Sequence, residues 1–126
     1  MLLDGLNALM SGYAPLTNVV GSQMYLVMLP ATYSAPALTY YLVSNRTEVA
    51  LDKTATSMDT VDINVWAANY HDAALGRQAL HALLDGFQGT LSDGTAILYT
   101  ASQDNPDQYE LDTRLYRCST SFTFTH

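Results

Sequence analysis

The chain has 126 residues, of which 48 % are hydrophobic and only 13 % are charged, with a formal net charge of −7 and one cysteine. This length fits one domain with a sizeable core, and the five scattered Lys and Arg residues argue against nucleic-acid binding through phosphates. Cys118 has no partner for an internal disulfide, and the sequence shows neither an export signal nor an apolar run long enough to span a membrane. We therefore expect a soluble protein that folds in the cytosol.

The first third of the sequence predicts a helix and then a strand. Leucines and a methionine follow helical spacing over residues 2–10, and Gly12 and Pro15 end that helix, although residues 16–20 are compatible with one more helical turn. A strand is expected over residues 23–29. Proline cannot donate an amide hydrogen to a sheet, so the segment between Pro30 and Pro36 is expected to be an exposed loop.

A polar connection separates the next two predicted strands. Residues 38–44 are rich in Thr, Tyr, Leu and Val, which favour a strand, and a further strand begins near residue 57. Between them, residues 45–56 carry Arg46, Glu48, Asp52 and Lys53. We interpret the pair as a hairpin with a long tip.

The sharpest local signal is the change of period within residues 57–84. Val61, Ile63 and Val65 alternate with polar residues, as in a half-buried strand, and residues 73–84 then follow helical spacing. Asn69 and Asp72 are both good helix N-caps. The pattern predicts that the strand's apolar side chains pack under three residues of the helix, Leu75, Ala79 and Leu83.

The last third predicts two more strands. A turn at residues 92–94 leads into a strand over 95–101, and a polar loop over 103–107 with Asp104 and Asp107 precedes a long strand over 108–125, with a bulge near Asp112. The predicted fold class is α+β. We expect a single domain over residues 1–126, a mainly antiparallel sheet with two helices packed on one face, and a long hairpin.

No residue pattern predicts catalysis or a cofactor. His71, His81 and His126 lack the spacing of a metal site, and the acidic loop around Asp104 lacks the ligand order of a calcium loop. Cys118 lies in a predicted strand without a neighbouring His, which favours a small buried core residue over a nucleophile. We therefore expect a non-enzymatic protein with no catalytic, metal or cofactor-binding residues.

The order of these features resembles the tail completion or tail terminator proteins of long-tailed bacteriophages, including the minor tail proteins that join a tail to its head. The resemblance covers nearly the whole chain and is one of pattern and order, because none of the matching segments is catalytic. It involves the N-terminal leucine helix, the Ala- and Leu-rich helix, and residues 20–25, 36–41, 61–67 and 112–117. The loops at 33–36 and 103–107 have no counterpart in that pattern.

This resemblance implies a subunit of a homohexameric ring that caps the tail tube and faces the head. The implied partners are other copies of the chain, the tail tube protein and the head–tail connector protein, with DNA passing through without specific binding and no membrane involved. The implied location is the head-proximal end of the virion tail, after assembly in the host cytoplasm. An acidic channel wall would repel DNA phosphates, although acidity that only maintains solubility explains the charge equally well.

Polar loops flanked by strands are the expected contact regions, and the candidate residues are Arg46, Glu48, Asp52, Lys53, Asp104 and Asp107. One alternative is a connector or stopper ring on the head side. Another is a small ligand-binding α+β domain, which requires a pocket with convergent polar groups.

Overall fold

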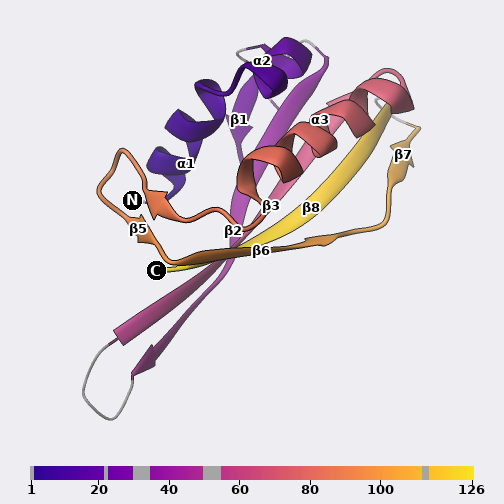
Figure 1. Ribbon diagram of the computed structural model, residues 1–126. Coiled ribbons are helices and arrows are strands. Elements are labelled where there is room, and N and C mark those ends of the chain that lie inside the picture. The colour runs from indigo at the N-terminus through magenta and orange to yellow at the C-terminus, as the bar shows by residue number, and fades with distance from the viewer. Residues whose placement is uncertain (1, 22, 30–34, 50–54, 112–113) are drawn as a thin grey trace.

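A computed structural model describes residues 2–21, 23–29, 35–49, 55–111 and 114–126 (Figure 1). Its main sheet has the strand order β1-β2-β3-β8-β6, with β7 also paired to β8, and β4 and β5 form a separate small hairpin. The helices are α1 (Leu2–Ser11), α2 (Ala14–Val20) and α3 (Tyr70–Leu84). The strands are β1 (Met24–Leu26), β2 (Ala37–Val49), β3 (Ala55–Ala67), β4 (Gly89–Thr90), β5 (Ala96–Ile97), β6 (Tyr99–Asp104), β7 (Gln108–Glu110) and β8 (Leu115–Thr125).

The helices pack on one face of the sheet and enclose the main core there (Figure 1). Val61, Ile63 and Val65 of β3 are fully buried, as their alternation predicts. They form one cluster with apolar residues of every helix and of β8, including Leu6, Leu16, Leu80, Leu84, Phe122 and Phe124. The predicted α+β class, with a mostly antiparallel sheet and helices on one face, is confirmed.

The N-terminal region differs from the prediction in two respects. Residues 14–20 form a helix, α2, with Pro15 in its first turn, so the described chain has three helices rather than two. Pro15 suits this position because the first amides of a helix have no intrahelical acceptor. The strand predicted over 23–29 shortens to β1, which pairs in parallel with β2 through Met24 and Leu38. Most of the loop predicted between the two prolines lies outside the described residues.

The hairpin of β2 and β3 is more regular than predicted. Its strands pair from Ala37 with Trp66 as far as Val49 with Ala55, so much of the predicted 45–56 tip is continuous sheet. One irregularity lies between Leu42 and Ser44, where the register shifts by one residue. Such a bulge increases the local twist of a ribbon.

Helix α3 is capped and packed through small residues. The Asn69 side chain accepts a hydrogen bond from the amide of Asp72, so Asn69 is the N-cap and Asp72 lies in the first turn. A Cβ atom on Gly76 would lie 2.6 Å from Cγ1 of Val65, which shows how closely α3 approaches β3. The prediction that Leu75 and Leu83 pack on the strand was wrong for Leu75, which is 39 % exposed.

The C-terminal half is divided more finely than predicted. The strand expected at 95–101 is two strands, β5 and β6, and β6 extends to Asp104, so the start of the predicted 103–107 loop belongs to the sheet. The long strand expected over 108–125 is also two strands, β7 and β8, which pair with each other. The bulge predicted near Asp112 falls outside the described residues.

Candidate interaction surfaces

The β2–β3 hairpin extends beyond the body of the molecule as a two-stranded arm (Figure 1). We define the arm as β2 from Ser44 to Val49 and β3 from Ala55 to Ser57. Strand β8 supports β3 only as far as Ser57, where two backbone hydrogen bonds join Ser57 and His126. Six residues of strand span about 20 Å, so the described part of the arm is long relative to a small domain.

Of the four contact residues predicted in the hairpin, the structure describes Arg46 fully and Glu48 in part. Arg46 is exposed, and its backbone pairs with Met58. The backbone of Glu48 pairs with Thr56, but its side chain lies outside the described structure. Asp52 and Lys53 are outside the described residues altogether. That these four residues contact a partner stays a prediction.

Asp104 belongs to a polar cluster that joins α3 to β6. The two ring nitrogens of His81 lie 2.9 Å from an Asp85 oxygen and 2.7 Å from an Asp104 oxygen. Thr120 donates to the same Asp104 oxygen at 2.8 Å, and Ser102 donates to Asp85 at 2.6 Å. Only a protonated imidazole has two N–H groups to donate, so the cluster favours the charged form of His81.

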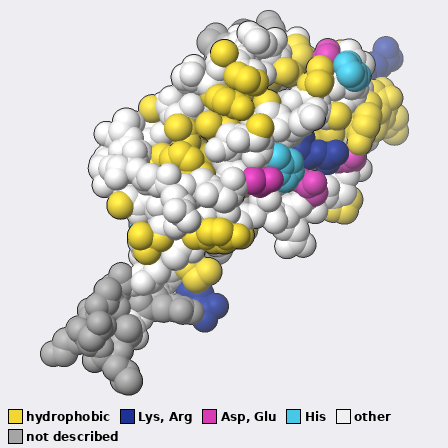
Figure 2. Space-filling view, viewed as in Figure 1, with side chains coloured by type: hydrophobic (Ala, Val, Ile, Leu, Met, Phe, Trp, Pro, Cys, Tyr) yellow, Lys and Arg dark blue, Asp and Glu magenta, His cyan; other side chains and the backbone are white. Residues whose placement is uncertain are grey.

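Asp107 forms an ion pair with Arg77 on the same face of the molecule as the cluster of His81 and Asp104. It accepts hydrogen bonds from the guanidinium of Arg77 and from the Tyr70 hydroxyl, at 2.5 Å for Tyr70. Figure 2 shows acidic, basic and histidine side chains gathered on this face. The predicted contact residues Asp104 and Asp107 therefore both have partners on α3 within the chain, and their contact with another subunit stays a prediction.

Sequence reasoning missed the role of His81. The spacing of the histidines only argued against a metal site, whereas in the structure His81 pairs with Asp104, 23 residues later on a strand, and no local sequence pattern predicts such a contact. His71 is exposed, as expected for a residue at the start of the helix. His126 lies 2.9 Å from an oxygen of Asp59, at the root of the arm.

Cys118 is a buried core residue, as predicted, with 1 % of its surface exposed. Burial is the largest influence on its thiol and raises the pKa to about 11. A thiol in this environment is a poor nucleophile, because the thiolate is the reactive form. Among the described residues, no group of three or more His, Cys, Asp or Glu side chains could hold a metal ion.

The sheet face away from the helices is rich in hydroxyl groups. Asp62 on this face accepts hydrogen bonds from Tyr41 and Ser121, and Asn105 donates to Ser119 and Ser121. Toward one end of the face, the Trp66 indole donates to Thr39 at 2.9 Å. The polar groups of this face largely satisfy one another.

An apolar turn projects at that end of the sheet. We call residues 26–29 the knob: Leu26, Val27 and Met28 are 53 %, 62 % and 71 % exposed, and Leu29 follows. The Met28 amide donates to the Leu26 carbonyl at 2.9 Å, and Val27 has a φ of 74°, the geometry of a strained γ-turn that β-branched residues rarely adopt. Val27, Met28 and Leu29 line a hollow with Trp66.

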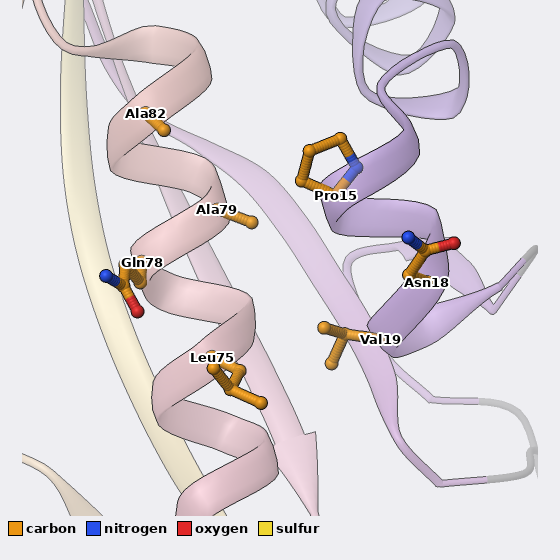
Figure 3. Close-up of a pocket in the computed structure, with 7 residues that line it drawn as sticks. All are labelled: Pro15, Asn18, Val19, Leu75, Gln78, Ala79 and Ala82. Atoms are coloured by element: carbon orange, nitrogen blue, oxygen red, sulfur yellow. The ribbon is translucent and has the colours of Figure 1, made fainter.

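An apolar groove lies between α2 and α3 on the opposite face of the sheet (Figure 3). We call this hollow of about 490 Å³ the groove; it is lined by Pro15, Asn18, Val19, Leu75, Gln78, Ala79 and Ala82. Pro15 and Val19 of α2 face Leu75 and Ala79 of α3 across it (Figure 3). Leu75, which was predicted to pack on the strand, instead forms part of this wall.

A scan against protein-family models and a search of curated proteins find no match to the sequence. Among solved structures, the fold is similar to a chain in the virion of a native gene transfer agent particle. The TM-score is 0.78 at 20 % sequence identity, and the similarity covers 98 % of this chain and 92 % of that chain. In the described part of this chain, no helix is both long and apolar enough to cross a membrane.

Proposed function

We propose that this protein is a structural component of a phage-like virion, a tail completion or terminator subunit that forms a ring on the tail tube and joins it to the head connector. The observation that carries the proposal is the similarity of almost the whole fold to a virion chain. The similarity extends over 98 % of this chain and 92 % of that chain, so it is not limited to one shared motif. The role proposed is non-enzymatic.

The arm also supports a role in assembly. A two-stranded ribbon outside a core contributes little to the stability of its own domain, because isolated hairpins are marginal in water. Its outer strand edges present backbone N–H and C=O groups that can pair with another chain. Val49, the last residue of β2, is 67 % exposed. Thr47, two residues before it on the same strand, is uncharged. A protruding ribbon of this kind is suited to contacts between subunits.

The low density of charge on the surface is consistent with a ring. Only 13 % of residues are charged, so contacts between copies can form over uncharged surface without placing carboxylates opposite one another. A cyclic ring of identical subunits joins two different patches of the same surface, and it closes when the rotation between neighbours divides a full turn. The proposed ring has six copies.

Light scattering after size-exclusion chromatography tests the proposal on the purified chain, alone and with tail tube protein. The expected result is a species of six times the 13.8 kDa subunit mass, formed either alone or on the tube. A chain that remains monomeric in both conditions contradicts the proposal. Separate mixing with tube protein and with head-side connector distinguishes the terminator from the alternative stopper ring, because only a terminator binds the tube.

A shortened arm provides a second test. Replacing residues 48–56 with Asn-Gly joins the paired residues Thr47 and Ser57 through a two-residue turn. The body should still fold, because the β3–β8 ladder begins at Met58, but ring formation should be lost. Arg46→Glu is a milder variant, which we expect to fold and to assemble poorly. Normal ring formation by the shortened chain would exclude the arm from the interface.

A further inference from the structure

We propose that the knob of one copy docks in the groove of the next copy. The inference rests on the ring proposed above and adds to the arm a second contact between neighbouring copies. The knob is a convex apolar turn at residues 26–29, and the groove is a concave apolar surface between α2 and α3. Both surfaces are exposed in the isolated chain, and an apolar turn that projects can fill an apolar groove.

The chemistry of the two surfaces matches. The three most exposed knob residues carry aliphatic or thioether side chains, and Met28 in particular is unbranched and adapts to irregular cavities. Val19, Leu75 and Ala79 provide apolar lining of the groove, and the amides of Asn18 and Gln78 also lie among its lining residues. An apolar centre with polar groups around it is the usual anatomy of a protein interface.

The positions of the two surfaces exclude a contact within one chain. The knob shares its hollow with Thr39 and Trp66, which alternate with the core residues of their strands and so lie on the face away from the helices. The groove is formed by two helices on the other face. A contact between patches on opposite faces is heterologous, so it joins successive copies head to tail and generates a ring or a filament.

The charges of the two surfaces are compatible with a second copy as the occupant of the groove. The chain carries a net charge of −7, so a contact between copies must avoid placing carboxylates opposite one another. Glu110 lines the hollow beside the knob, but neither residues 26–29 nor the seven groove residues include a charged side chain, so Glu110 would meet no carboxylate among the groove residues. The acidic residues nearest the groove in sequence on α3 are Asp72 and Asp85, and Asp85 is directed to His81 and Ser102 instead.

The backbone of the knob adds an independent reason. A valine at a φ of 74° is strained, and such strain is found where a turn is held in one shape for recognition. Two hydrogen bonds hold it here, from Val27 to the Tyr40 carbonyl at 3.0 Å and from Met28 to Leu26 at 2.9 Å. The apolar side chains are thereby fixed in an exposed position before any partner arrives.

Disulfide cross-linking between two variants, each with one introduced cysteine besides the buried Cys118, tests the contact. Met28→Cys and Ala82→Cys are purified separately, mixed in equal amounts with tail tube protein present, and oxidised with copper phenanthroline. We expect cross-linked dimers in the mixture and none from either variant alone, and a ladder of larger species from the double variant. Dimers from Met28→Cys alone would indicate a knob-to-knob contact and overturn the proposal, as would a mixture that does not cross-link.

Charge substitution separates this inference from the ring itself. Met28→Glu should fold, since the side chain is 71 % exposed, and should lose ring formation in light scattering. The matched control is Leu98→Glu, at an apolar position that is 59 % exposed and belongs to neither surface; it should assemble normally. If wild type and Met28→Glu both form rings, the knob contact is wrong and the ring stands. If wild type forms none, both proposals fail.

Discussion

At the scale of single residues, Gly76 shows how tightly α3 packs on the sheet. A methyl group at this position would overlap the side chain of Val65, and both residues are buried. Alanine is ordinarily better than glycine inside a helix by about 1 kcal/mol. At this position helix propensity therefore favours alanine, whereas close packing against Val65 favours glycine.

We predict that Gly76→Ala destabilises the protein by about 1–3 kcal/mol, because overpacking of a rigid core outweighs the gain in helix propensity. Urea unfolding followed by circular dichroism gives the change in free energy. Gln78→Ala, at an exposed position two residues later, should change stability by less than about 0.5 kcal/mol. A more stable Gly76→Ala variant would show that α3 moves away from Val65 at little cost.

His81 provides a pH-dependent contact at the same scale. Partial burial lowers the pKa of its imidazole, but the hydrogen bonds that it donates to Asp85 and Asp104 outweigh burial and raise the pKa above its ordinary value. A pKa that is higher in the folded state means that the stabilisation is complete below the unfolded value, about 6.5, and is lost as the pH rises through the folded value. For Asp104, burial raises the pKa, but hydrogen bonds from His81 and Thr120 lower it overall, so its contribution is lost in acid.

We predict that His81→Gln destabilises the protein by about 0.5–1 kcal/mol near pH 6, the range of partly exposed ion pairs. The difference from wild type should shrink as the pH is raised above about 6.5. Thermal unfolding of both proteins from about pH 6 upward measures this difference. The control is His71→Gln, on the exposed first turn of the same helix. A difference that grows with pH would contradict the charged form of His81.

At the scale of elements, the beginning of α3 depends on one side chain. Asn69 Oδ1 accepts from the Asp72 amide at 2.9 Å and satisfies one of the first free N–H groups of the helix. We predict that Asn69→Ala costs about 1 kcal/mol in urea unfolding, whereas Asn69→Ser, which keeps an acceptor, costs less than half as much. Equal losses for both variants would mean that the cap contributes through something other than its oxygen.

Local sequence patterns predicted those elements whose signal is local. The alternation of Val61, Ile63 and Val65 and the cap at Asn69 both depend on near neighbours, and both are confirmed. The parallel pairing of β1 with β2 depends on residues such as Tyr25 and Thr39 finding each other across an intervening loop, which no period in the sequence encodes.

The errors within α3 and along the hairpin have a common physical cause. Helical spacing alone cannot tell which side of a helix meets the sheet, and small residues, including Gly76, face β3 while Leu75 lines the groove. Along the arm, polar residues such as Thr47 and Ser57 pair regularly because the adjoining strands fix their register. Of the candidate site, the sequence predicted the exposed arm but neither the knob nor the groove, since both combine residues from separate elements.

At the scale of the whole molecule, one core supports the helices and the central strands together. We predict that Ile63→Asp, at a fully buried position, unfolds the entire body, because an unpaired buried carboxylate costs several kcal/mol out of about 5–15. Near- and far-UV circular dichroism should both lose the native signal. The control is Thr123→Asp, on the opposite face of the sheet, which should remain folded. A folded Ile63→Asp variant would contradict the prediction and show that water reaches the centre of the sheet.

The buried thiol of Cys118 has a practical consequence. Because it is 1 % exposed and its pKa is raised to about 11, maleimide and nitroxide reagents should leave it unmodified in the folded protein. The natural sequence therefore already serves as a background for site-directed spectroscopy. A single cysteine placed at any exposed position then carries one spin label or fluorophore per subunit, and the set of distances between labels reports the symmetry and diameter of an assembly in solution.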